Sequence, residues 1–262
     1  MPNVTLTIDG RQVTVPAGTT VLEAAREAGI FIPTLCHDPL LPGWGACRLC
    51  VVEILGMRNL PASCVTPVAE GMVVYTASEA VIEARRTIID LLLSNHPMDC
   101  LTCEKAGSCA LQDYAYAYGV KEPKYRGRMR DYEPETSNPF FERDHAKCIM
   151  CGCCIRICDE IVGASAIDYA YRGFSVKVSA PYDEGLEKST CVFCGNCVAS
   201  CPVGALIPKG EKGKGRVWQT DSVLTTCPYC GVGCSIYLRV RNGRVVAASG
   251  ANGPANRGLL CV

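Results

Sequence analysis

The chain has 262 residues, of which 20 are cysteines, and its 26 basic and 26 acidic residues leave no basic excess of the kind that marks a nucleic-acid-binding protein. Disulfide scaffolds with a similar density of cysteine are much shorter, whereas 48% hydrophobic residues over this length can bury several small cores. These counts exclude nucleic acid as an expected partner and leave metal binding as the expected role of the cysteines.

The first residues and the apolar segments bear on the compartment. The start, MPNVTLTIDG, has no basic segment followed by an apolar one, so no secretory signal is recognised. The longest apolar run, Ile88 to Leu93, contains Asp90 and falls far short of a membrane span. We expect a cytoplasmic protein in a reducing compartment, without membrane insertion.

The first predicted elements are two strands joined by a tight turn. Residues 4–8 and 13–15 are rich in strand-forming residues, and Asp9-Gly10 between them favours a hairpin. A helix is predicted from Val21 to Ala28, with Thr20 as its cap. The order strand, turn, strand, helix and cysteine-bearing loop is that of a β-grasp ferredoxin domain.

The first cysteine group follows this helix. Its loop, Gly43 to Cys50, is rich in glycine, which lets backbone N–H groups approach the sulfurs of a cluster. The spacing departs from that of plant-type ferredoxins, so those proteins are not the model. We predict a [2Fe–2S] site, with a structural zinc as the alternative, and its ligands are Cys36, Cys47, Cys50 and Cys64.

The second group holds three cysteines, one fewer than a [4Fe–4S] cubane needs. A helix is predicted from Val81 to Leu93, and His96 follows it. A histidine in this position is ordinarily a solvated residue at a helix end, but imidazole is also a competent metal ligand. Five clusters need 20 ligands, and 20 cysteines less one spare leave a place that His96 can fill. The predicted ligands are His96, Cys100, Cys103 and Cys109.

The third and fourth groups repeat the spacing C-x2-C-x2-C-x3-C, and Pro202 follows the second copy as in bacterial ferredoxins. In such pairs the fourth cysteine of each run binds the other cluster. Two zinc sites are the alternative, although zinc ribbons do not need cysteines at the third and fourth positions. We predict two cubanes, one held by Cys148, Cys151, Cys154 and Cys201, and the other by Cys191, Cys194, Cys197 and Cys158.

The spare cysteine is Cys153, which lies outside the register of the repeated motif. We expect it to be a buried bystander near the cluster, with a redox role or a role as an alternative ligand as the other interpretation.

The last group has a long gap before its fourth cysteine. Within this gap two strands are predicted, 235–240 and 244–248, joined by the hairpin turn Asn242-Gly243, which would return the chain to the metal. From spacing alone such a group could hold zinc as well as a [4Fe–4S] cluster. The predicted ligands are Cys227, Cys230, Cys234 and Cys261.

The ordered set of motifs from Cys36 to Cys234, including the segment TCPYCGVGC that begins at Thr226, resembles the amino-terminal part of NAD-dependent formate dehydrogenase large subunits. Residues 1–150, approximately, also resemble the iron–sulfur region of the large peripheral subunit of bacterial complex I and of iron-only hydrogenases. The resemblance implies one [2Fe–2S] and four [4Fe–4S] clusters, with His96 as a ligand. They would connect a flavin subunit that uses NAD(H) to a second redox site.

In the formate dehydrogenases the second redox site is a molybdenum or tungsten pterin in a large domain after the last cluster. The sequence ends at Val262, so we expect neither that domain, its catalytic cysteine or selenocysteine, nor the family's lysine shortly after the fourth cysteine. The chain is then expected to be one piece of a split enzyme or a dedicated electron-transfer subunit.

The expected fold class is α+β, a multi-domain iron–sulfur protein with boundaries near residues 78, 137 and 215. Residues 1–78 are the β-grasp [2Fe–2S] domain, 79–137 a helical His/Cys domain, 138–215 the two-cluster ferredoxin domain and 216–262 a small β-rich cluster domain. No G-x-G-x-x-G fingerprint follows a strand, so we do not expect the chain itself to bind NAD or flavin.

The predicted function is electron transfer in a cytoplasmic NAD(P)-linked oxidoreductase complex, by a subunit without catalysis of its own. Its expected partners in a hetero-oligomer are a flavin-containing NAD(P)H-binding subunit and a second redox subunit that holds a pterin or a flavin or is linked to ferredoxin. Electron bifurcation at a partner flavin is one version of this function. The alternatives are the cluster-bearing piece of a split formate dehydrogenase and a zinc-stabilised scaffold.

Overall fold

The structure is a computed structural model that describes residues 2–261, which form two compact units. The first unit contains the residues up to Ser94 together with Tyr114–Gly127, and the second contains Asn95–Asp113 and the residues from Arg128 onward. Both units mix helices and sheets, as the predicted fold class requires at that level. The finer division into four domains stays a prediction.

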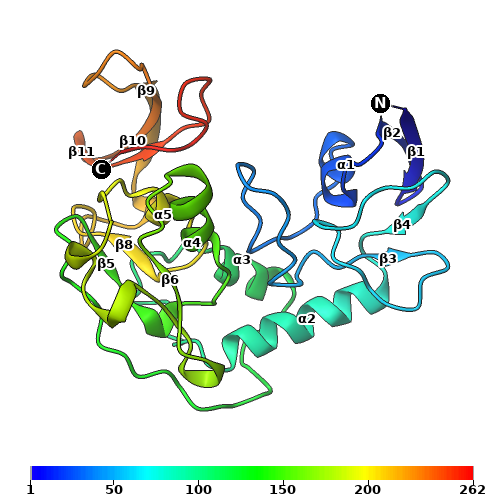
Figure 1. Cartoon of the computed structure of the whole chain (residues 1–262), viewed down its shortest axis with the longest axis horizontal. Coiled ribbons are helices and arrows are strands. Elements are labelled where there is room, and N and C mark those ends of the chain that lie inside the picture. The colour runs from blue at the N-terminus through cyan, green and yellow to red at the C-terminus, as the bar shows by residue number, and fades with distance from the viewer. Residues whose placement is uncertain (1, 262) are drawn as a thin grey trace. The chain divides into compact units, whose positions relative to one another are not determined.

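The first unit is built on a four-stranded sheet with the strand order β2-β1-β4-β3 (Figure 1). Strand β1 pairs antiparallel with β2 and parallel with β4, and β4 pairs antiparallel with β3. Asp9 and Gly10 have φ values of 48° and 79°, as a type I′ hairpin turn requires, so the predicted hairpin is confirmed. The strands are β1 Asn3–Ile8, β2 Arg11–Pro16, β3 Glu53–Ile54 and β4 Val73–Tyr75.

Helix α1, Val21–Glu27, begins where the sequence predicted and ends one residue earlier. The Thr20 hydroxyl accepts a hydrogen bond from the Glu23 N–H, and the Glu23 carboxylate accepts one from the Thr20 N–H, so both ends of the cap are satisfied. The buried side of α1 and the inward residues of β1 and β2 form one core. Two cysteines of the first group, Cys50 and Cys64, belong to that core.

Helix α2, Glu79–Leu93, is capped by Ser78 and begins two residues before the predicted start. Its buried face recurs every four residues, at Val81, Arg85, Ile89 and Leu93, and therefore includes a charged side chain. Helix α3, Ala110–Ala117, follows the second cysteine group. Among residues 2–261, no helix combines the length and the apolar character needed to cross a bilayer.

The second unit is made of short elements between cysteine loops. Strands β5 and β8 pair antiparallel, as do β6 and β7. Helix α4 continues into a π-helical segment, η2. The bounds are β5 Phe141–Arg143, η1 His145–Lys147, α4 Cys153–Arg156, η2 Ile157–Ile161, β6 Asp168–Ala170, η3 Gly173–Ser175, β7 Lys177–Ser179, η4 Pro181–Asp183, η5 Leu186–Lys188, α5 Asn196–Ser200, β8 Leu206–Pro208 and η6 Val217–Gln219.

The last part of the second unit is an antiparallel sheet with the order β11-β10-β9, drawn in orange to red in Figure 1. Its strands are β9 Asp221–Thr226, β10 Ser235–Arg241 and β11 Arg244–Gly250. Asn242 and Gly243 have φ values of 51° and 72°, which confirms the predicted turn and the two strands on either side of it. Sequence reasoning missed β9, whose residues are all exposed.

Candidate metal centres

The two ferredoxin-type motifs adopt the same backbone conformation. In each, the residue before the second cysteine and the glycine after it have positive φ values: 56° at Met150 and 79° at Gly152, then 54° at Phe193 and 74° at Gly195. A short helix, α4 or α5, begins directly after each glycine. The N–H groups of Met150 and Phe193 each donate to the sulfur of the first cysteine of their motif at 3.4 Å. The sequence repeat is therefore also a structural repeat.

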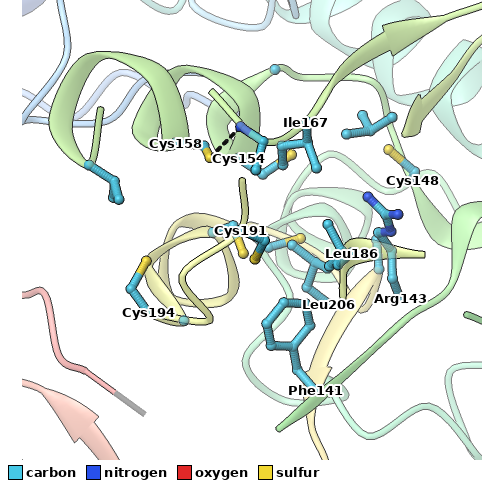
Figure 2. Close-up of a pocket in the computed structure, with 18 of the residues that line it drawn as sticks. Phe141, Arg143, Cys148, Cys154, Cys158, Ile167, Leu186, Cys191, Cys194 and Leu206 are labelled. Carbon is cyan, nitrogen blue, oxygen red and sulfur yellow. Dashed lines mark hydrogen bonds between the residues drawn. The ribbon is translucent and has the colours of Figure 1, made fainter. Parts of the chain in front are cut away.

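All eight cysteines of these motifs line one pocket (Figure 2). Apolar side chains complete much of its wall, and Phe141, Leu186 and Leu206 lie beside the cysteines in the figure. Soft sulfur ligands within an apolar shell suit iron–sulfur clusters, because such a shell limits the access of water to the metal. The pocket cysteines are Cys148, Cys151, Cys154, Cys158, Cys191, Cys194, Cys197 and Cys201.

The fourth cysteine of each motif lies among the thiols of the other motif. Burial and the nearby thiols Cys151 and Cys148 of the first motif raise the pKa of Cys201 to about 12. Burial, the thiols of its own motif and Cys158 of the first motif raise the pKa of Cys197 to about 12. These neighbours agree with the predicted exchange of ligands. The raised pKa values mean that iron binding must release protons from this pocket.

The first cysteine group lies in the core of the first unit. Cys36, Cys50 and Cys64 are each at most 2% exposed. The sulfurs of Cys50 and Cys64 lie 3.4 Å apart, and the Cys47 N–H donates to the Cys36 sulfur at 3.3 Å. Hydrogen bonds with the thiols of Cys36 and Cys64 lower the pKa of Cys47 and of Cys50, respectively, to about 6. Two of the four side chains are thus thiolates near neutral pH, which is the form that binds iron.

The glycine-rich loop before Cys47 passes very close to the backbone at Cys64. A Cβ atom added at Gly43 would lie 1.9 Å from the Cys64 carbonyl oxygen, and one added at Gly45 would lie 3.3 Å from the Val65 side chain. Because only glycine permits this approach, the loop and the Cys64 segment can face a common small group.

His96 has the environment of a metal ligand rather than that of a solvated helix-end residue. Its Nδ1 atom is buried and has no hydrogen-bond partner within residues 2–261. Burial lowers the pKa of His96, so the ring is neutral at pH 7 and can coordinate a metal. A buried polar nitrogen without a partner costs free energy, and a bound metal would remove that cost. His96 therefore fits the place of the missing fourth ligand.

The second cysteine group packs against the ferredoxin pocket. A Cβ atom at Gly204, three residues after Cys201, would lie 2.7 Å from the Cys103 sulfur. Lys147, the residue before the first pocket cysteine, forms ion pairs with Asp99 at 3.2 Å and Asp144 at 3.1 Å. Two predicted metal groups are thus neighbours within one unit.

The last cysteine group is more exposed than the others. Cys227 and Cys234 are half-buried at the ends of β9 and β10, and the Cys227 N–H donates to the Cys234 carbonyl at 2.8 Å. Cys230 and Cys261 are exposed. The structure therefore brings two of the four predicted ligands together through the strand pair.

Asn256 holds the segment that returns after β11. Its side-chain amide accepts from the Ser235 N–H at 3.1 Å and donates to the carbonyls of Ser235 at 3.0 Å and Leu259 at 2.7 Å. Ser235 follows Cys234, and Leu259 lies two residues before Cys261. The hairpin and Asn256 together return the chain toward the metal group, as the sequence analysis expected.

Several residues near these groups were missed by sequence reasoning. Lys147 and Gly204 give no local signal, because their contacts lie far away in sequence. Arg85 does give one, since it is a charge at helical spacing between the apolar residues Val81 and Ile89. Cys153 is 3% exposed, as expected of a buried bystander. Among residues 2–261, no three His, Cys, Asp or Glu side chains converge closely enough to hold a single metal ion.

Four family models match successive parts of the chain. A "2Fe-2S iron-sulfur cluster binding domain" matches residues 2–79, and the "NADH-ubiquinone oxidoreductase-G iron-sulfur binding region" matches residues 85–124. The "NADH-quinone oxidoreductase subunit 3, ferredoxin-like domain" matches residues 138–207, and the "Molybdopterin oxidoreductase Fe4S4 domain" matches residues 220–262. All five predicted metal groups lie in segments that match iron–sulfur models.

Relatives of the chain include subunits of several oxidoreductases. The alpha subunit of NADPH-Fe(3+) oxidoreductase from Geobacter sulfurreducens is 40% identical over 99% of this chain and 30% of its own length. The NADH-quinone oxidoreductase-G 2 protein from Rhizobium meliloti is 40% identical over 98% of this chain and 30% of its own length. NADP-reducing hydrogenase subunit HndD from Solidesulfovibrio fructosivorans is 44% identical over 79% of this chain and 36% of its own length. The chain thus spans about a third of the curated relatives that it matches.

A solved structure matches the fold. A chain in a crystal structure of NAD+-reducing [NiFe]-hydrogenase in the H2-reduced state aligns with a TM-score of 0.76 and 33% identity, over 82% of this chain and 91% of that chain. The predicted resemblance to the complex I subunit is confirmed by these matches, and a link to hydrogenases is present as well. The resemblance to formate dehydrogenases stays a prediction.

Proposed function

Because the chain belongs to the family of the amino-terminal iron–sulfur region of NADH-quinone oxidoreductase-G, to which subunits of NAD-reducing hydrogenases are related, we propose that it transfers single electrons within an NAD(P)-linked complex. The relatives share NAD(P) chemistry in their names but differ in the other substrate, which is ferric iron, a quinone or hydrogen. The region common to them is best explained as their common path for electrons.

The observation that carries this proposal is the pocket of eight cysteines with crossed neighbours. Two [4Fe–4S] clusters would be held there, with Cys201 completing the first motif's set and Cys158 the second's. When bound, such clusters accept and donate one electron at a time. The chain's own residues supply thiolates, apolar walls that limit water, and backbone N–H groups that donate to sulfur.

The remaining ligand sets are proposed from the same kind of fit. Cys36, Cys47, Cys50 and Cys64 would hold one [2Fe–2S] cluster, and His96 with Cys100, Cys103 and Cys109 would hold a third cubane. The contact between Cys103 and Gly204 supports electron exchange between this third site and the Cys201 site. The fourth cubane is assigned to Cys227, Cys230, Cys234 and Cys261. The domain boundaries near 78, 137 and 215 are part of this proposal.

The partners and the compartment follow from the same reading. We propose a cytoplasmic hetero-oligomer in which a flavin-containing subunit exchanges electrons with NAD(P)H, and a second redox subunit exchanges them at the other end. The second subunit would hold a pterin or a flavin, or would be linked to ferredoxin, and bifurcation at the flavin is compatible with this arrangement. The match of residues 220–262 to a molybdopterin oxidoreductase domain favours a second candidate, the cluster-bearing part of a split formate dehydrogenase.

Metal analysis of the anaerobically purified chain tests the proposal. One two-iron and four four-iron clusters amount to about 18 irons and an equal number of acid-labile sulfides per chain, with the brown colour of iron–sulfur proteins. About four zincs with little iron, in a colourless protein, would contradict the proposal. A deficit of four irons would place the error in a single cubane assignment, which variants of the exposed Cys230 would identify.

A second measurement tests the role as a carrier. The chain alone should show no turnover with formate, hydrogen or NADH, because those reactions need a group that handles a hydride or an electron pair. Dithionite should nevertheless reduce its clusters, and NADH should do so once the flavin subunit is added. Formate oxidation by this polypeptide alone would overturn the assignment.

A further inference from the structure

The buried face of α2 presents one guanidinium to the first cysteine group. Arg85 is 3% exposed, and all three of its nitrogen atoms donate hydrogen bonds. Nε donates to the Leu49 carbonyl at 3.1 Å and Nη2 to the Val51 carbonyl at 2.8 Å. Nη1 donates to the Tyr118 hydroxyl at 3.0 Å. A single side chain therefore bridges the two carbonyls on either side of Cys50.

The residue between those carbonyls is held from the opposite direction as well. The Cys50 carbonyl accepts from the Ser63 N–H at 3.1 Å and from the Ser63 hydroxyl at 2.7 Å, and Ser63 precedes Cys64. Three successive carbonyls, at residues 49 to 51, are thus fixed by Arg85 and Ser63. This fixation holds the Cys50 sulfur 3.4 Å from that of Cys64.

The charge of Arg85 is not neutralised by a side chain. Within the part of the chain that the structure describes, no carboxylate forms an ion pair with it. Asp90, the other buried charge on α2, instead accepts a hydrogen bond from the Lys124 N–H at 2.7 Å. Burying an unpaired cation is costly unless a negative group compensates for it. An all-cysteine [2Fe–2S] centre, with a net charge of about −2 when oxidised and −3 when reduced, is such a group.

We propose that Arg85 is a positioning residue for Cys50 and that its buried charge raises the reduction potential of the [2Fe–2S] centre in the first cysteine group. The inference rests on the proposed function of that group. Reduction adds one electron, forms and breaks no bond, and makes the centre more negative by one charge. A nearby cation in a medium of low dielectric constant stabilises the reduced form more than the oxidised form.

The test is a redox titration with dithionite of the full chain after anaerobic reconstitution with iron and sulfide. The [2Fe–2S] signal is followed by electron paramagnetic resonance at a temperature where the cubane signals have broadened away. Arg85→Gln should shift the midpoint potential downward. Arg86→Gln is the matched control, because it removes the same charge one residue away from a side chain that is exposed and paired with Glu83 at 3.8 Å. The control should retain the midpoint of the parent chain.

Arg85→Lys separates charge from positioning. Lysine retains the charge but cannot bridge two carbonyls with a planar fork, so the midpoint should stay close to that of the parent. The lifetime of the [2Fe–2S] visible absorption in the presence of a chelator should fall by roughly fivefold, the effect of one lost buried hydrogen bond. This variant also decides the matter if Arg85→Gln does not fold, because an unchanged lifetime would overturn the positioning role.

The outcomes distinguish this inference from the proposed function. A parent chain that assembles no [2Fe–2S] centre would refute the proposed function of the first group. A parent that assembles one, together with an Arg85→Gln variant whose midpoint is unchanged, would overturn the inference alone.

Discussion

Gly43→Ala tests whether the first cysteine group depends on close packing of its loop. The added Cβ atom would lie 1.9 Å from the carbonyl oxygen of Cys64, and ordinary contacts begin at 3.4 Å, so one segment must withdraw by about 1.5 Å. The neighbour is backbone, so no side-chain rotation can relieve the clash. Cys64 is itself a proposed ligand, and a withdrawal of this size would separate it from its partners.

The expected magnitude follows from comparing two opposing effects. Overpacking at a close contact costs about 1–3 kcal/mol. Replacing glycine with alanine gains about 0.4–1 kcal/mol when the backbone is compatible, because the unfolded chain loses freedom. The clash is the larger effect at Gly43. At Gly127, nothing lies within 4 Å of the added atom, so only the gain should apply there.

The assay is the temperature at which the visible signal of the [2Fe–2S] centre is lost, together with the iron content of the chain. Gly43→Ala should lower that temperature and reduce the [2Fe–2S] content relative to the cubanes. Gly127→Ala should leave the content unchanged and keep the temperature the same or slightly higher. Equal behaviour of the two variants would refute the argument that the loop must approach Cys64 this closely.

Other substitutions test the remaining groups. His96→Cys should retain a cluster but lower its potential, because a thiolate adds negative charge where a neutral imidazole stood, and His96→Ala should make that cluster labile; unchanged resonance spectra and iron content in both would return His96 to a helix-end role. Cys153→Ser should keep the full iron content, whereas a loss of four irons would make it a ligand. An iron chelator should remove about four irons in a fast phase from the exposed last group. Cys230→Ala should lack that phase, and a fast phase that persists in this variant would assign it to another group.

The local elements of the first unit could be predicted from the sequence, because short-range chemistry decides them. Asp9-Gly10 can adopt two positive φ values, and Thr20 with Glu23 can close a capping box, whatever surrounds them. The ligand residues could also be predicted, since cluster chemistry fixes the spacing of cysteines along the chain. The four domain boundaries and the exact ligand sets stay predictions.

The contacts that shape the sites could not be predicted in the same way. Gly204 meets Cys103, and Arg85 meets Leu49, across long stretches of chain, and no local pattern specifies such pairs. Strand β9 was missed because all of its residues are exposed, so it shows no alternation of buried and exposed positions. It pairs with β10 over its whole length through backbone hydrogen bonds, which depend little on side-chain identity.

The crossed arrangement of the eight pocket cysteines has a consequence for the order in which the second unit acquires iron. A cluster that joins Cys154 to Cys201 closes a chain loop of about 47 residues, and by the entropy argument used for disulfides this restricts the unfolded chain by about 4 kcal/mol. The second cluster joins Cys158 to Cys191 inside that loop. The first cluster to form therefore brings the ligands of the second together, so the two should load as an all-or-none pair, with few chains holding only one of them.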